Sequence, residues 1–156
     1  MNKLESLDKL LGKIDNQTMV NHSEPSVGGA FGVKVDDEEY KKAVADFFAK
    51  GIKNGFDFIE DYSEKQIQFI IALILVDFVE IVYLRTLREL MENYFKTDNK
   101  GYLALVEILT VGNYKKISEV AVAIYHSTDK EVMKTFFDIV AKNTIFYVAM
   151  KRINGE

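Results

Sequence analysis

The sequence predicts an all-α protein that folds as a single helical domain. Its 156 residues contain one proline and no tryptophan, and 48% of them are apolar, which is enough to build a sizeable core. Eight consecutive apolar residues at 69–76 must be covered on nearly all sides. Elsewhere apolar residues recur mostly at helical spacing. We therefore expect a bundle of about six helices around a buried central helix over 64–96.

Composition narrows the classes of function. The chain has no cysteine, so disulfides, thiolate metal sites and cysteine nucleophiles are excluded. No apolar signal segment stands at the N-terminus, which predicts a cytoplasmic protein. A net charge of −4 argues against general coating of nucleic acid, because phosphate contacts need clustered Lys and Arg. Residues 102–156 nevertheless carry seven basic and six acidic side chains, so a polyanion would prefer this part.

Two segments precede the first long helix. The apolar residues of 1–14 follow the three-four-three spacing of an amphipathic helix, namely Leu4, Leu7, Leu11 and Ile14. A helix this short is marginal alone, so it needs a surface to dock on, either its own core or another chain. Residues 15–35 contain Pro25 and several glycines and predict a flexible loop, with a short β-strand or hairpin within 27–35.

Residues 36–101 predict a helical hairpin. Its first helix presents one apolar face and ends at either Gly51 or Gly55, where a left-handed residue can stop it. An aromatic linker follows. The central helix then begins at Ser63, because Ser-Glu-Lys-Gln66 has the pattern of a capping box.

Charged residues interrupt the central helix after its apolar run. Asp77 and Glu80 argue against a membrane span, which needs about 20 predominantly apolar residues. An unbroken helix over 64–96 would be about 50 Å long, so we expect a bend near Asp77 or an end that projects and finds a partner. Arg85 and Arg88 follow one or two turns later and are candidate partners for the carboxylates. The four charged residues predict a subunit interface.

Residues 105–145 resemble the helix-turn-helix core of winged-helix DNA-binding proteins. A first helix supplies the core residues Leu105, Val106 and Leu109. The sequence Ile-Ser-Glu-Val-Ala opens a second helix at 117–121, and a turn that Ser or Thr can cap follows at 126–129. A third helix then matches the family's spacing with Val132, Phe136, Ile139 and Asn143.

The resemblance implies a three-helix unit over 102–156 that binds DNA. Four lysines are then expected to contact phosphate, namely Lys115, Lys116, Lys130 and Lys134. Too few residues follow for a complete wing, and 144–153 fits either a continued helix or a strand. A plain bundle is the alternative, with one buried stripe made of Val132, Phe136, Ile139, Val140, Phe146 or Tyr147, and Met150.

No set of residues in the sequence indicates catalysis. His22 and His126 lack partners at the spacing of a zinc site or a nucleophile-base pair, so we expect no metal, cofactor or enzymatic activity. We expect instead a non-enzymatic assembly or adaptor subunit that contacts a protein partner or itself, for example within a nucleoprotein complex. In size, acidity and helical class the chain is similar to the small subunits of CRISPR effector complexes. A helix-turn-helix transcriptional regulator is the alternative, and a virion component is a minor one.

Overall fold

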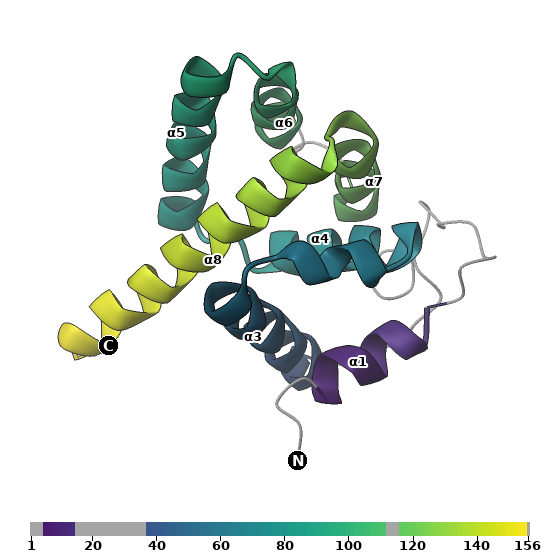
Figure 1. Cartoon of the computed structure of the whole chain (residues 1–156). Helices are drawn as coiled ribbons and strands as arrows, with labels where there is room; N and C mark the ends of the chain where they lie inside the picture. Colours follow the sequence, from purple (N-terminus) through teal and green to yellow (C-terminus); the bar gives the residue numbers. More distant parts are fainter. Residues whose placement is uncertain (1–4, 15–36, 112–115, 156) are drawn as a thin grey trace.

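The computed structural model describes residues 5–14, 37–111 and 116–155, and every regular element among them is helical (Figure 1). These residues form α1 (Glu5–Gly12), α3 (Asp37–Asn54), the 3-10 helix η1 (Asp57–Asp61), α4 (Glu64–Val76), α5 (Glu80–Thr97), α6 (Lys100–Val111), α7 (Ile117–Ser127) and α8 (Lys130–Ile153). The all-α prediction is confirmed. The loop expected at 15–35, with its strand or hairpin, lies outside the described residues.

Helix α4 supplies the centre of the core. Its eight consecutive residues from Ile67 to Ile74 are all buried. The helix begins with the predicted capping box: the Ser63 hydroxyl accepts from the Gln66 N–H at 3.2 Å, and Gln66 Oε1 accepts from the Ser63 N–H at 2.9 Å. Helix α7 packs against α4, and α3 also contacts it. The apolar run is thus enclosed from Phe69 to Ile74, whereas Leu75 is partly buried and Val76 is exposed at the end of the helix.

The chain breaks between α4 and α5. Asp77 ends α4 with φ −115° and ψ 34°, and Val79 is extended before α5 begins. The prediction of one helix over 64–96 is therefore wrong, whereas the expected bend near Asp77 is confirmed. The break lets α5 turn and pack against α6 and α8, which buries Val82 and Leu90. A straight continuation would carry both side chains away from the core.

Helix α1 docks on the protein's own core. Its apolar residues are buried where α1 packs against α3, namely Leu7, Leu10, Leu11 and Ile14. Gln66 Nε2 donates to the Leu11 carbonyl at 3.2 Å, so the side chain that completes the α4 cap also satisfies a carbonyl at the end of α1. The sequence left two surfaces open for this helix, the protein's own core or another chain. The structure shows the first, because α1 packs against α3.

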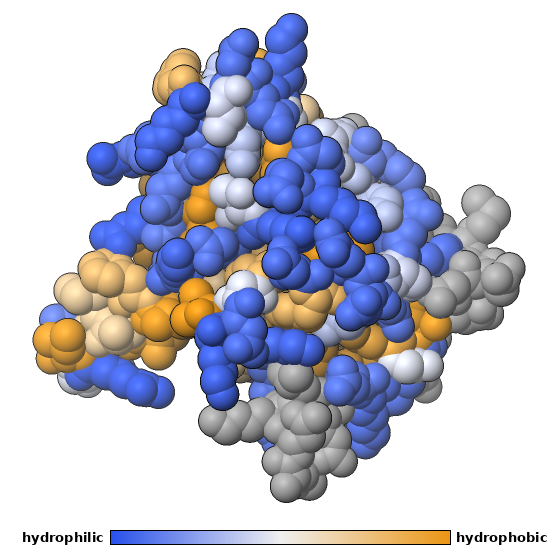
Figure 2. All heavy atoms as spheres, in the orientation of Figure 1, coloured by the Kyte–Doolittle hydropathy of each residue, from blue (hydrophilic) through white to orange (hydrophobic). Residues whose placement is uncertain are grey.

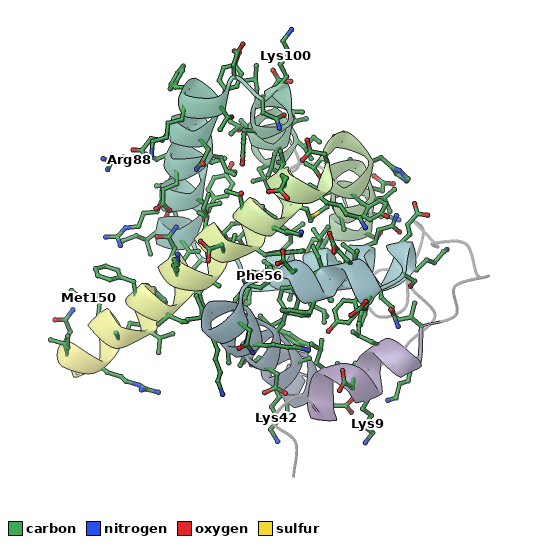
Figure 3. The ribbon with its side chains drawn as sticks, in the orientation of Figure 1. Lys9, Lys42, Phe56, Arg88, Lys100 and Met150 are labelled. Carbon is green, nitrogen blue, oxygen red and sulfur yellow. The ribbon has the colours of Figure 1, made fainter. Side chains whose placement is uncertain are left out.

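An aromatic cluster joins α3, η1 and α8. The ring centroid of Phe47 lies 5.2 Å from that of Phe56 and 4.9 Å from that of Phe137. Figure 3 shows Phe56 in the interior of the molecule. Its ring lies against Gly51, where an added Cβ would collide with it. Helix α3 therefore continues through Gly51 and ends before Gly55, whose φ is +82°. The predicted stop at Gly55 is confirmed, and the one at Gly51 is wrong.

Helix α8 crosses the molecule and packs against α3 and α5. It stays helical to Ile153, so 144–153 continues the last helix and forms no strand. Its buried residues lie between Val132 and Ala141. The predicted buried stripe is confirmed for Val132, Phe136, Ile139 and Val140. Of the alternatives Phe146 and Tyr147, Tyr147 is partly buried against the core and Phe146 is exposed. The prediction is wrong for Met150, which is exposed.

The double role of Gln66 yields a stability prediction. Gln66→Glu keeps an acceptor for the Ser63 N–H but removes the donor to the Leu11 carbonyl, and should lower the free energy of unfolding by about 1 kcal/mol. Gln66→Ala removes both bonds and should cost roughly 2 kcal/mol. Urea unfolding followed by circular dichroism measures the difference. If Gln66→Glu is as stable as the unsubstituted chain, the bond to α1 contributes nothing.

Candidate interaction face

The C-terminal end of α8 extends beyond the body of the protein (Figure 1). Its buried residues end at Ala141, and beyond that point large apolar side chains are exposed, namely Ile145, Phe146, Val148, Met150 and Ile153. Residues 145, 146, 148 and 150 do not share one side of a helix that turns every 3.6 residues. The projecting end is therefore apolar around most of its circumference. A helix of this kind is normally buried.

Helix α5 extends this apolar surface. Ile81 and Leu84 are also about half exposed, and α5 packs against α8. We call the combined surface the α5–α8 face, made of Ile81, Leu84, Ile145, Phe146, Val148, Met150 and Ile153. Figure 2 shows apolar residues gathered on the projecting end of α8, where Figure 3 labels Met150. Exposed apolar patches on a protein surface often mark interaction sites.

Two hollows adjoin the α5–α8 face. One has a volume of about 200 Å³ and lies among α3, α4, α5 and α8, where Phe48, Leu73 and Phe78 line it. The other has a volume of about 280 Å³ and lies between α5 and α8, where Ile81, Phe146 and Met150 line it. Val82 and Tyr147 line both hollows. An aliphatic side chain from a partner has room to enter either one.

Charged residues surround the α5–α8 face but do not form the predicted pairs. Asp77 and Glu80 are exposed where α4 gives way to α5. The Arg85 guanidinium lies over the Phe146 ring, 4.6 Å from its centroid. Arg88 Nε pairs with Glu92 Oε1 at 3.2 Å and points away from the body (Figure 3).

The expectation that these arginines neutralise Asp77 and Glu80 is therefore wrong. The carboxylates need no such partner, because the break in the chain places them in water rather than inside a helix core. Of the four residues predicted at an interface, Arg85 lines the hollow between α5 and α8, and Asp77 lines the other one.

The lysines predicted to contact phosphate have unequal surroundings. Lys115 lies outside the described residues. Lys116 precedes α7 and Lys130 begins α8, and both are exposed. The side chain of Lys134 is only 17% exposed, and its ammonium lies 2.9 Å from Asp57 and 3.1 Å from Glu60. Hydrogen bonds to these two carboxylates raise the pKa of Lys134. Lys134 thus ties α8 to η1 instead of facing solvent with Lys130.

Asp129 fixes the turn between α7 and α8. Its carboxylate accepts from the Val132 N–H at 2.8 Å and so caps α8. It also accepts from the Asn99 amide at 3.2 Å, which links this turn to the turn between α5 and α6. The backbone bond from Val132, followed by the bond from Asn99, lowers the pKa of Asp129 from its usual value of 3.8.

The histidine and tyrosine side chains elsewhere make local contacts. His126 Nε2 lies 3.4 Å from Glu64, an exposed pairing between α7 and α4. His22 lies outside the described residues. Burial, aided by Asp8 and Asp61, raises the pKa of Tyr62 to about 12. Among the residues that the structure describes, no three His, Asp or Glu side chains are grouped closely enough to hold a metal ion.

Comparisons with known proteins found no relative. The chain matches no family model, no curated protein and no solved structure. Within the described parts of the chain, no helix is both long enough and apolar enough to cross a bilayer.

Sequence reasoning missed the α5–α8 face because it assigned Met150, with Phe146 or Tyr147, to a buried stripe. The missed signal lies in their neighbours. Ile145 and Val148 fall on other sides of the same helix. Among the residues that the structure describes, no element covers these four side chains.

The low pKa of Asp129 predicts a pH-dependent contribution to stability. An acid whose pKa is lowered on folding stabilises the protein above its unfolded pKa, and the stabilisation is lost as pH falls through the folded pKa. Asp129→Ala should therefore cost about 1 kcal/mol at pH 7. The difference from the unsubstituted chain should shrink as the pH is lowered from about 5 to about 2.

Chemical unfolding at several pH values measures this difference. Asp138→Ala is the control, because Asp138 forms only a surface pair with Lys142 one turn further along α8. A constant cost for Asp129→Ala across the pH range would contradict the proposed role of the carboxylate.

Proposed function

We propose that this protein is a non-enzymatic assembly subunit that works by protein–protein contact through the α5–α8 face. The observation that carries the proposal is the projecting end of α8, which exposes apolar side chains on several sides. Such a helix is stable in water only at a cost, because each large apolar side chain gains roughly 1.5–3 kcal/mol when it is fully buried. A partner that covers the face recovers that free energy.

The composition of the face also suits a protein partner. Ile81, Phe146 and Met150 line the hollow between α5 and α8, and the charged residues Arg85 and Lys151 line the same hollow. An apolar centre with a polar rim is the usual anatomy of a protein interface. A place in a nucleoprotein complex, such as that of a CRISPR effector small subunit, agrees with the size, acidity and helical class of the chain. A virion subunit would use the same kind of surface.

A matched pair of exposed side chains tests this function. Ile153 at the tip of α8 is 77% exposed, and Phe95 near the end of α5 is 74% exposed but lies outside the α5–α8 face. A photo-crosslinking amino acid at position 153, in the chain expressed in its native cells, should form discrete protein adducts. The same group at position 95 should form few. Equal adduct yields at both positions, or none at position 153, would contradict the proposal.

Binding of nucleic acid through the helix-turn-helix-like unit is the second candidate. It is favoured by the capped turn at Asp129 and by the exposure of Lys116 and Lys130 on either side of α7. Lys134 offers less support, since its ammonium is already engaged with Asp57 and Glu60. The nearly balanced charge of residues 102–156 also supports only weak phosphate contact.

Fluorescence anisotropy with a labelled random duplex and a labelled single strand tests this candidate. If the lysines contact phosphate, binding should weaken steeply with salt, and the double variant Lys116→Glu with Lys130→Glu should reduce affinity at least about tenfold. Lys9→Glu with Lys42→Glu is the matched control, because those lysines lie on α1 and α3 (Figure 3). No binding at low salt would remove the candidate.

A further inference from the structure

We propose that the partner covering the α5–α8 face is a second copy of this chain, related by a two-fold axis that sets the two α8 ends antiparallel. This inference rests on the proposed function and names the partner. It is carried by three observations: the geometry of the projecting helix, the charges at its two ends, and the size of the apolar surface.

The geometry of α8 suits a self-complementary contact. Residues 144–153 form about 15 Å of helix at 1.5 Å per residue, or nearly three turns. In an isologous dimer the same surface is contributed by both copies, so each contact occurs twice. Antiparallel overlap places Ile153 of one copy beside the hollow of about 280 Å³ in the other, which Ile81 and Phe146 line. The end of α8 that is exposed in one copy is then covered by the same end of α8 in the other copy.

The charges favour the antiparallel direction. Lys151 and Arg152 are exposed at the tip of α8, whereas Asp77 and Glu80 are exposed at the junction of α4 and α5. Asp77 shares a hollow with Lys41 and with Thr144 and Tyr147 at the base of the projecting end, and the Arg85 guanidinium lies over the Phe146 ring. Antiparallel overlap brings the basic tip of one copy toward Asp77 and Glu80 of the other, twice in the dimer. A parallel arrangement would instead place the two basic tips together. Opposed helix dipoles add to the same preference.

The apolar surface supplies most of the area that a dimer contact needs. The seven apolar residues of the face are 40 to 77% exposed, and at roughly 90 Å² each they amount to on the order of 600 Å². A stable interface buries about 800 Å² per partner. The aliphatic stems of Lys151 and Arg152 and the walls of the two hollows supply further area.

Sedimentation equilibrium of the purified full chain tests the proposal. The unsubstituted chain should sediment at twice the mass of the monomer, with a dissociation constant in the micromolar range or below. Ile153→Glu should weaken the dimer at least about a hundredfold, because it places two carboxylates in the apolar contact. Phe95→Glu, at a similarly exposed position outside the face, should leave the dissociation constant unchanged. Circular dichroism checks that both variants fold.

A charge exchange distinguishes the antiparallel arrangement from other dimers. Arg152→Glu and Glu80→Arg should each weaken association, by about tenfold, since each replaces two attractions with two repulsions. The double variant restores opposite charges and should recover most of the loss. A double variant that is weaker than either single one would overturn the arrangement.

The outcomes separate this proposal from the proposed function. A chain that stays monomeric at every accessible concentration, or a dimer unaffected by Ile153→Glu, overturns the pairing with a second copy. If adducts at position 153 in cells then contain a different protein, the assembly function stands with another partner. If no adduct forms there, both proposals fail.

Discussion

Helix α4 carries eight successive buried side chains, from Ile67 to Ile74, and leaves no side of itself for water. Neighbouring helices bury these side chains: α7 packs against α4, and α3 also contacts it. The end of α1 is joined to the first turn of α4 by the hydrogen bond from Gln66 to the Leu11 carbonyl. The aromatic rings of Phe47, Phe56 and Phe137 then join α3 and η1 to α8. The first half of α8 is therefore held in place by its packing against α3 and by this aromatic cluster.

That position has a consequence at the other end of α8. Its first half is fixed by burial between α3 and α5, so a straight helix of 24 residues must leave the body before it ends. The sequence of its last turns is still that of a core helix, with Ile145, Val148 and Met150 on different sides. Apolar residues at a projecting end are destabilising unless something covers them. The proposed contact with a partner would cover them.

Local signals in the sequence were enough to predict the helices and most of their limits. The capping box at Ser63 and the stop at Gly55 depend on neighbouring residues alone, which is why both are confirmed. The sequence left a bend near Asp77 and a projecting end as alternatives, because packing against α6 and α8 decides how α5 turns. It also left Gly51 and Gly55 as alternative stops for α3, because local pattern does not reveal that Gly51 makes room for the ring of Phe56.

The candidate face lay partly within reach of the sequence. Asp77, Glu80, Arg85 and Arg88 pointed to the correct region, although their pairing was wrong. Its apolar residues could not be found from periodicity. A helix buried within one chain and a helix buried against a partner have the same pattern of apolar residues. Only the place where α8 leaves the body separates Ala141, which is buried, from Ile145, which is not.

Hydrogen exchange of the full chain at increasing protein concentration tests most directly whether the end of α8 is covered by another copy. Amides of 145–153 should exchange more slowly as concentration rises, whereas those of 132–141 should not change, because they are already buried within one chain. Exchange at 145–153 that stays the same at every concentration would contradict the account. That result would mean that a second copy of this protein does not cover the projecting end of α8.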